Sequence, residues 1–181
     1  MKLLIMLQGL PLSGKSTLAA KLKEQFPEVT VLKTTNIREL SKIPSSRDFD
    51  ETNLETKKQK DESYKILLDQ AKLFLNQERI VVLDATFHQL HRRVWVYEFV
   101  KQYRIPLLVI KCALKNQKGI QELLLKRRQS QERDDVLNTY EMYHMMKKQL
   151  QKITKEEIQQ YQLNIKNYNW EKENIFTDIF L

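Results

Sequence analysis

The stretch Gly9-Leu10-Pro11-Leu12-Ser13-Gly14-Lys15-Ser16 matches the pattern G-x-x-x-x-G-K-[S/T] at every required position, and Thr17 follows it. Glycines at both ends of such a loop let the backbone wrap so that its N–H groups point inward at phosphate oxygens. The lysine of this pattern reaches the β- and γ-phosphates, and the next hydroxyl is a Mg²⁺ ligand. Two of the three glycines in the chain occupy the two required positions. We therefore predict a nucleotide-binding loop over Gly9 to Thr17, with Lys15 on the phosphates and Ser16 on Mg²⁺.

Apolar runs of strand length alternate with helical patterns on both sides of this loop. An apolar run at residues 3–7 precedes it, and Leu18, Leu22 and Phe26 recur at helical spacing after it. The other expected strands are residues 29–32, 80–83 and 106–110, and the other expected helices are residues 54–77, 92–103, 118–128, 136–151 and 155–167. Strands rich in Leu, Val and Ile that precede helices indicate a parallel sheet covered on both faces. We therefore expect an α/β fold with a doubly wound parallel sheet, in one domain over residues 1–181.

Two segments have weaker patterns. Residues 38–50 contain the turn-forming run Pro44-Ser45-Ser46, so we expect an irregular segment there. Residues 175–181 are a candidate edge strand.

The charge of the chain favours an anionic partner. The formal net charge is +8, and the stretch from Lys115 to Lys155 contains ten Lys or Arg residues but only five Asp or Glu residues. A solvated basic surface would give the same composition, so both interpretations stay open. No apolar run approaches the roughly 18–20 residues of a membrane span, and the single cysteine, Cys112, fits a reducing compartment. We expect a cytoplasmic protein without a membrane segment.

A second motif ends the expected strand at residues 80–83. The run Val81-Val82-Leu83-Asp84 is apolar and closes on an acid, and Ala85-Thr86 follows. An acid at this place holds Mg²⁺ or its bound water opposite the phosphate loop. Many buried strands end in aspartate, so the motif gains its weight from the loop. Asp84 is therefore the second candidate metal-site residue beside Ser16.

Together with Thr34-Thr35-Asn36-Ile37-Arg38 and Val82 to Thr86, the loop resembles the polynucleotide-kinase-type P-loop phosphotransferases, which include the 5′-OH polynucleotide kinases and the seryl-tRNA kinases. The similarity continues through Arg92-Arg93 to Lys126-Arg127-Arg128 and Arg133, over roughly residues 3–150. It implies a P-loop NTPase fold with a five-stranded parallel sheet, an arginine-bearing helical lid at about residues 116–150 and a C-terminal helical extension at about residues 152–181.

The resemblance also implies a reaction, in which ATP (or GTP) with Mg²⁺ donates its γ-phosphoryl group to an acceptor hydroxyl of RNA, DNA or tRNA. Arg38 would hold the acceptor side, and Asp84 would orient Arg38 or a metal-bound water. The lid would close over the transferring group through Arg127, Arg128 or Arg133. A small-molecule kinase and a nucleotide-binding regulatory protein without transfer activity are the alternatives.

One departure from the family concerns the general base. The family carries an aspartate three residues before the arginine that matches Arg38, and this chain has Thr35 there, with Asn36 next. Neither side chain accepts a proton near neutral pH. The nearest acids are Glu39, Asp48 and Asp50. A slow kinase, a nucleotide hydrolase and a binding protein are all compatible with this change.

Two further groups have competing interpretations. His88 and His91 are spaced three apart after Asp84, as in some metal sites, but no third ligand is apparent. In residues 136–151, one set of side chains could stack on bases beside Lys147 and Lys148. These are Tyr140, Tyr143, Met145 and Met146. A helix core stripe is the favoured interpretation of the same segment. It would comprise Val136, Tyr140, Tyr143 and Leu150.

Overall fold

Five parallel strands form the centre of the molecule in the order β2-β3-β1-β4-β5. The computed structural model describes residues 2–43, 52–113, 119–129 and 140–168, with the backbone alone for residues 127 and 128. The strands are β1 (Leu3–Gln8), β2 (Val29–Lys33), β3 (Ile80–Asp84), β4 (Leu107–Cys112) and β5 (Asn164–Tyr168). The helices are α1 (Lys15–Gln25), α2 (Thr34–Leu40), α3 (Leu54–Leu75), α4 (Leu90–Tyr103), α5 (Ile120–Gln129), α6 (Tyr140–Lys148) and α7 (Lys155–Tyr161). The expected doubly wound α/β fold is confirmed.

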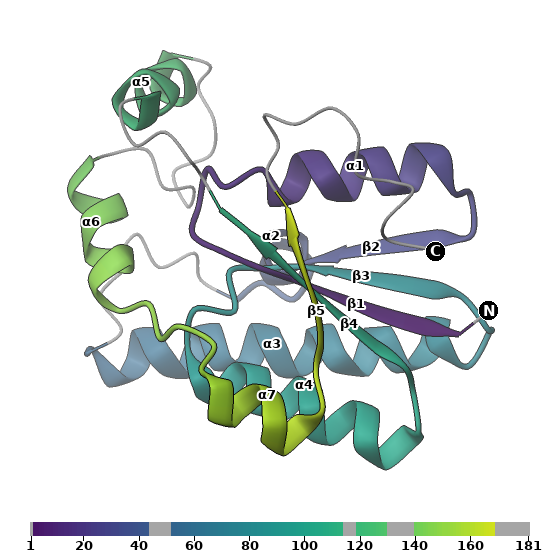
Figure 1. Cartoon of the computed structure of the whole chain (residues 1–181). Helices are drawn as coiled ribbons and strands as arrows, with labels where there is room; N and C mark the ends of the chain where they lie inside the picture. Colours follow the sequence, from purple (N-terminus) through teal and green to yellow (C-terminus); the bar gives the residue numbers. More distant parts are fainter. Residues whose placement is uncertain (1, 44–51, 114–118, 130–139, 169–181) are drawn as a thin grey trace.

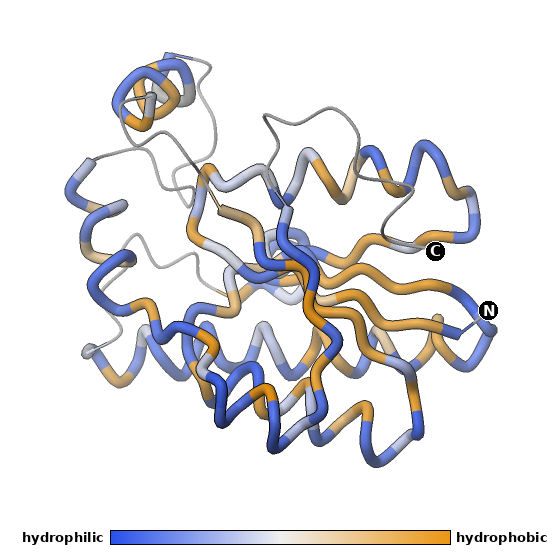
Figure 2. The backbone as a smooth tube through the Cα atoms, viewed as in Figure 1, coloured by the Kyte–Doolittle hydropathy of each residue, from blue (hydrophilic) through white to orange (hydrophobic). Residues whose placement is uncertain are grey.

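Helices cover both faces of the sheet, with α1 on one side and α3, α4 and α7 on the other (Figure 1). Alternate residues of a strand point to opposite faces, so β1 sends Leu4 and Met6 into the cluster with α3 and α4, and Ile5 and Leu7 into the cluster with α1. The central strands are therefore apolar over most of their length and carry polar residues toward their carboxyl ends, while the helices turn polar residues outward (Figure 2). This is the burial that the unbroken Leu, Val and Ile runs predict.

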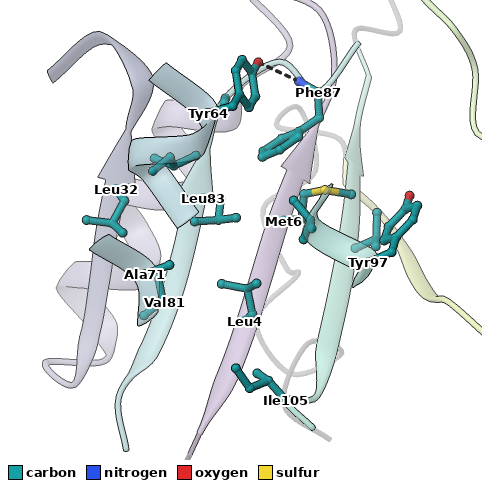
Figure 3. Close-up of a cluster of buried hydrophobic side chains, with 14 of the residues drawn as sticks. Leu4, Met6, Leu32, Tyr64, Ala71, Val81, Leu83, Phe87, Tyr97 and Ile105 are labelled. Atoms are coloured by element: carbon teal, nitrogen blue, oxygen red, sulfur yellow. Dashed lines mark hydrogen bonds between the residues drawn. The ribbon is translucent and has the colours of Figure 1, made fainter. Parts of the chain in front are cut away.

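The larger cluster extends up to the end of β3, where Tyr64 of α3 meets Phe87 (Figure 3). Their rings pack edge to face with centroids 5.1 Å apart, and the Phe87 N–H donates to the Tyr64 hydroxyl over 3.4 Å. The segment that follows Asp84 is thus held by the core below it.

Helix α7 is attached to α4 through a buried ion pair. Both Arg93 of α4 and Glu157 of α7 are buried, and the guanidinium donates twice to the carboxylate, from Nε over 2.7 Å and from Nη2 over 2.9 Å. The Tyr97 hydroxyl donates to the same carboxylate over 2.7 Å. Nη1 of Arg93 donates to the carbonyls of Phe87 and Gln151, over 3.0 and 2.9 Å. One arginine therefore joins α4, α7 and the ends of two loops.

The expected helix at residues 155–167 is wrong in its second half. Helix α7 ends at Tyr161, where Gln162 takes a left-handed conformation with φ 50°, and β5 then pairs with β4. Ile165 is half-buried and Tyr168 buried in this edge strand, whereas Asn164 and Asn167 are exposed. The strand therefore lacks the apolar run that marks the central strands, and no glycine signals the end of the helix.

The expected irregular segment at residues 38–50 is wrong at its start, because α2 continues through Arg38 to Leu40. The rest of that expectation, from residue 44, lies outside the described residues, as does the candidate strand at 175–181. Within the described ranges, no helix is both long and apolar enough to cross a membrane.

Candidate active site

The predicted phosphate loop connects the carboxyl end of β1 to α1, and its two glycines are needed for different reasons. Gly14 caps α1 with φ 84°, a left-handed conformation that glycine adopts without strain. Gly9 lies against the end of β4, so that a Cβ added there would come within 2.3 Å of the Cys112 carbonyl oxygen. The Gly9 N–H donates to the Thr86 carbonyl over 3.1 Å. The loop is thereby fixed to both strands that flank β1.

Lys15 lies across the inside of this loop. It is buried, and its ammonium donates to the Leu10 carbonyl over 2.7 Å and to the Ser13 hydroxyl over 3.3 Å. Ser16 and Thr17 are exposed in the first turn of α1, which contains no acidic residue. The amino end of a helix carries partial positive charge and open N–H groups. Ammonium, hydroxyls and helix end together form a cradle suited to phosphate.

Asp84 ends β3 next to the loop. Register places it beside Leu7 of β1 on one side and Lys33 of β2 on the other. Its side chain is 5% exposed, and its Oδ2 has no hydrogen-bond partner among the described residues. The Lys33 ammonium is 3.9 Å from this oxygen, within ion-pair range but beyond hydrogen-bond length. A buried carboxylate oxygen without a donor is costly, and such oxygens are the ligands that Mg²⁺ prefers. The residue fits a metal site.

Helix α2 brings Arg38 and Thr35 to the same edge of the sheet, because it follows β2, the neighbour of β3. Thr35 is half-buried, and its hydroxyl donates to the Asn36 side-chain oxygen over 3.5 Å. Arg38 is half-buried in the last turn, and Glu39 beside it is exposed. Thus the loop, Asp84 and α2 occupy the carboxyl ends of three adjacent strands, where α/β sheets bind ligands.

The arginines expected in the lid are placed only in part. The α5 backbone carries positions 127 and 128, whose side chains are not described, and Arg133 lies outside the described residues, as do Asp48 and Asp50. We call α5 and α6 the lid helices, after the lid that the resemblance predicts for this part of the chain. They lie beyond the carboxyl ends of the strands, apart from the helices that cover the sheet (Figure 1).

The lid helices share a small apolar cluster, which we call the lid cluster. Its buried members are Ile120, Leu124, Tyr143 and Met146. Leu10 and Leu12 of the phosphate loop pack against it. The favoured core stripe therefore holds for Tyr143, whereas Tyr140 is 42% exposed, Leu150 is half-buried beyond the end of α6, and Val136 lies outside the described residues. Because Tyr143 and Met146 are buried, these two members of the alternative set are not open to stacking on bases. Sequence reasoning placed both leucines in the nucleotide-binding loop but predicted no packing for their side chains, because the loop pattern constrains only its glycines, lysine and hydroxyl.

The histidine pair after Asp84 is engaged by other side chains. His88 Nδ1 lies 2.9 Å from the Thr86 hydroxyl, which is 3.2 Å from the Tyr64 hydroxyl. His91 Nε2 lies 2.9 Å from an Asp61 oxygen, which also accepts from Arg92 Nε over 2.8 Å. No cluster of three or more His, Cys, Asp or Glu side chains suited to a metal occurs in the part of the chain that the structure describes.

Lys33 is a residue that sequence reasoning missed. Its signal was available, since parallel strands of known register would have placed the end of β2 beside Asp84. Arg92 and Arg93, which contribute to the family resemblance, are fully buried. Their hydrogen bonds hold α4 to α3 and α7, so both arginines have a structural role in the packing of these helices.

The site lies inside a region that matches a known family. The family model AAA_33, described as an AAA domain, matches residues 4–153. The chain belongs to this family. A curated relative by sequence, the 2′,3′-cyclic-nucleotide 3′-phosphodiesterase of Mus musculus, is 32% identical over 111 residues. The match covers 60% of this chain and 23% of the relative, so this chain corresponds to a minor part of that protein.

Solved structures share the AAA_33 chain's architecture. Kti12 from Chaetomium thermophilum, in complex with ADP–AlF3, superposes with a TM-score of 0.66 and 18% identity over 94% of this chain and 91% of that one. APS kinase from Mycobacterium tuberculosis, in complex with AMPPNP and APS, gives a TM-score of 0.55 and 19% identity over 72% and 76%. At these identities the likeness establishes the fold alone, the α/β fold of the P-loop type with a five-stranded parallel sheet.

Proposed function

We propose that the protein is an ATP- and Mg²⁺-dependent phosphotransferase that transfers the γ-phosphoryl group to a hydroxyl of a polynucleotide. The observation that carries this proposal is the pairing of two features at adjacent strand ends. One is the Lys15 cradle, and the other is Asp84, a buried carboxylate with an oxygen open to a cation. Phosphoryl transfer depends on positioning and charge neutralisation, and this pair supplies residues for both.

Each residue then has a part. Backbone N–H groups of the loop and the Lys15 ammonium bind the phosphates, and Ser16 with Asp84 would hold Mg²⁺. The metal supplies neutralisation of phosphate charge. Arg38 binds the acceptor side, and the lid arginines 127, 128 and 133 approach the transferring group. Thr35 supplies no proton acceptor, so the base comes from another acid or the transfer is slow.

The names of the similar proteins support a nucleotide at this site and an acceptor related to nucleic acid. Kti12 is seen with ADP–AlF3 and APS kinase with AMPPNP. The murine relative is named for its action on 2′,3′-cyclic nucleotides. That name concerns a phosphate on ribose hydroxyls, which favours a ribose or nucleic-acid acceptor over other metabolites.

The outer side of α6 also supports a nucleic-acid acceptor. Tyr140 is 42% exposed and its ring packs on His144, with centroids 4.3 Å apart. Lys147 and Lys148 are exposed in the last turn. Positions three and four apart share one side of a helix, so the ring pair and the lysines form one continuous strip. Stacking on aromatic rings beside lysines is the way that proteins bind single strands without sequence preference.

The transfer itself is tested by incubation with γ-labelled ATP, Mg²⁺ and a panel of 5′-OH oligonucleotides, tRNA and small metabolites. We expect label on a polynucleotide, and its loss with Lys15→Ala, because the variant removes the cation that meets the phosphates. Lys21→Ala, an exposed lysine of the same helix, is the matched control. Label on a small molecule would show that the acceptor is a metabolite and not a polynucleotide. Nucleotide binding without transfer to any acceptor would favour a regulatory protein.

Thr35→Asp separates the two accounts of the missing base. If position 35 is the base site, the variant raises single-turnover transfer, since general-base catalysis is worth about 10²–10⁴-fold. If Glu39 or another acid already acts as the general base, Thr35→Asp changes the rate little. Replacement of that acid by its amide, such as Glu39→Gln, then abolishes transfer.

The acceptor class has a separate test in the salt dependence of binding. We expect log affinity for single-stranded RNA to fall linearly with log salt, and each lysine lost from a phosphate contact to lower that slope by about 0.7. The double variant Lys147→Ala and Lys148→Ala should therefore flatten the slope. The exposed pair Lys57 and Lys58 of α3, changed in the same way, is the control. Equal salt dependence of RNA affinity in both double variants would show that these lysines of α6 do not contact the nucleic acid.

A further inference from the structure

The phosphate loop contains a backbone conformation that its own residue type disfavours. Leu12 has φ 69°, in the left-handed region, where a Cβ meets the backbone and glycine is the relaxed choice. Gly14, two residues on, takes the same region at φ 84° without that penalty. A strained leucine in a nucleotide-binding loop persists only where its surroundings stabilise it.

The lid cluster provides that stabilisation. Leu12 and its neighbour Leu10 pack against Ile120, Leu124, Tyr143 and Met146. Among the described residues of this cluster, the two leucines are the members that lie outside the lid helices. Burial of apolar side chains is the favourable term that offsets the strained backbone. The side chain of Leu12 therefore has its apolar partners in the lid cluster.

The same short segment also holds the lysine. The Leu10 carbonyl accepts from the Lys15 ammonium over 2.7 Å and from the Ser13 N–H over 3.3 Å. Its side chain faces the lid cluster while its carbonyl faces the cradle. A shift of Leu10 that separates it from the lid therefore also moves an acceptor of the Lys15 ammonium.

We propose that Leu12, together with Leu10, is a positioning residue that couples the docking of the lid helices to the shape of the phosphate loop. Ligand binding on the inside of the loop and lid docking on its outside are then two parts of one equilibrium. Coupling of this kind is reciprocal, so a nucleotide tightens the lid and a docked lid tightens the nucleotide. The inference rests on the nucleotide binding of the proposed function and on no particular acceptor.

The first test measures amide hydrogen exchange in peptides from residues 120–129 and 140–148 of the full chain, with and without Mg²⁺-ADP. In the wild type we expect ADP to slow exchange in both segments. Leu12→Gly relieves the strain and deletes the contact, so lid exchange should rise roughly 5-fold or more and ADP should no longer slow it. Leu12→Met keeps an apolar side chain of similar volume and should restore both effects.

The second test cuts the same contact from the lid, with a variant that leaves the loop intact. Leu124→Ala should weaken ADP binding, measured by calorimetry, by roughly 5-fold or more. The exposed leucine of the same helix, Leu125→Ala, is the control and should bind as the wild type does. If Leu124 only stabilised the lid helices and were not coupled to the loop, its truncation would leave the affinity for ADP unchanged.

The outcomes separate this inference from the proposed function. Wild type that fails to bind ADP would overturn nucleotide binding, and the coupling inference would fall with it. If wild type binds ADP, normal affinity in Leu124→Ala, or ADP protection of the lid that survives Leu12→Gly, would overturn the coupling alone.

Discussion

Helix α7 and the lid helices both follow β4 in the chain, yet they are attached to the rest of the domain in opposite ways. Helix α7 is held by a buried carboxylate that accepts three hydrogen bonds, two from Arg93 and one from Tyr97. The lid helices are held by a cluster of four buried apolar residues and two leucines of the phosphate loop. One attachment is directional and charged, and the other is apolar and small.

The difference shows how rigidity is distributed around the site. Bidentate arginine–carboxylate pairs permit essentially one geometry, so α4, α7 and the loop after β3 form a fixed frame. Apolar contacts have no preferred direction, so the lid helices can shift or detach at modest cost. Elements that move around ligands are drawn from the less stable parts of a structure. We expect the frame to unfold only with the whole domain and the lid to open by itself.

Removal of one partner of the buried pair is the largest effect we expect. Glu157→Ala leaves the Arg93 guanidinium buried and uncompensated, which costs about 3–5 kcal/mol of unfolding free energy. Urea unfolding monitored by circular dichroism measures it. The neighbouring Glu156→Ala, at an exposed position, is the control. If the two variants unfolded at the same urea concentration, the frame would not depend on this pair.

A truncation in the lid cluster should have a smaller and local effect. Leu124→Ala removes buried methyl groups, for which the usual cost begins at about 2 kcal/mol. We expect that cost in the local opening of residues 120–129 and 140–148, read by hydrogen exchange, with little change in the global urea midpoint. A fall of the global midpoint comparable to that of Glu157→Ala would show that lid and frame unfold together, and the contrast would be lost.

Acid should distinguish the two attachments more gently. Burial raises the pKa of Glu157, but the hydrogen bonds from Arg93 and Tyr97 and the Arg93 charge outweigh it and hold the pKa below its ordinary value. A depressed pKa contributes stability above the unfolded value, near ~4.3, and that contribution is lost as pH falls through the folded pKa. The buried lid cluster contains no carboxylate.

We therefore expect α7 to lose hydrogen-exchange protection at acid pH before the strands of the sheet do. Glu157→Gln should unfold with a shallower pH dependence than the wild type below about pH 4.3, as followed by urea midpoints. Parallel pH profiles of the two proteins would contradict the assigned role of this carboxylate.

The sequence predicted the central sheet well because each central strand is marked by local chemistry. The loop from Gly9 to Thr17 and the unbroken apolar run of β3 are short-range signals, and the fold follows from them. Strand β5 escaped because an edge position lets Asn164 and Asn167 face solvent. Its identity as a strand depends on pairing with β4.

The site was predictable to the extent that backbone pattern decides it. The motif predicted where Lys15 and Asp84 lie, at adjacent strand ends, and their roles stay predictions. It could not predict the left-handed φ of Leu12 or the packing of this side chain against helices more than a hundred residues away. Nor could it predict that α2 carries Arg38, because a seven-residue helix has little periodicity of its own.

The single cysteine of the chain is a natural probe of the carboxyl edge of the sheet, because its rate of reaction depends on its exposure. Cys112 ends β4 beneath Gly9, and burial raises the pKa of its thiol to about 12. Almost no thiolate exists at neutral pH, and thiolate is the form that reacts with disulfide reagents. Reaction must therefore wait for an opening of the core around β4 that exposes the thiol and lets it ionise. The rate of labelling therefore measures how often this part of the core opens, in the natural protein and without a substitution.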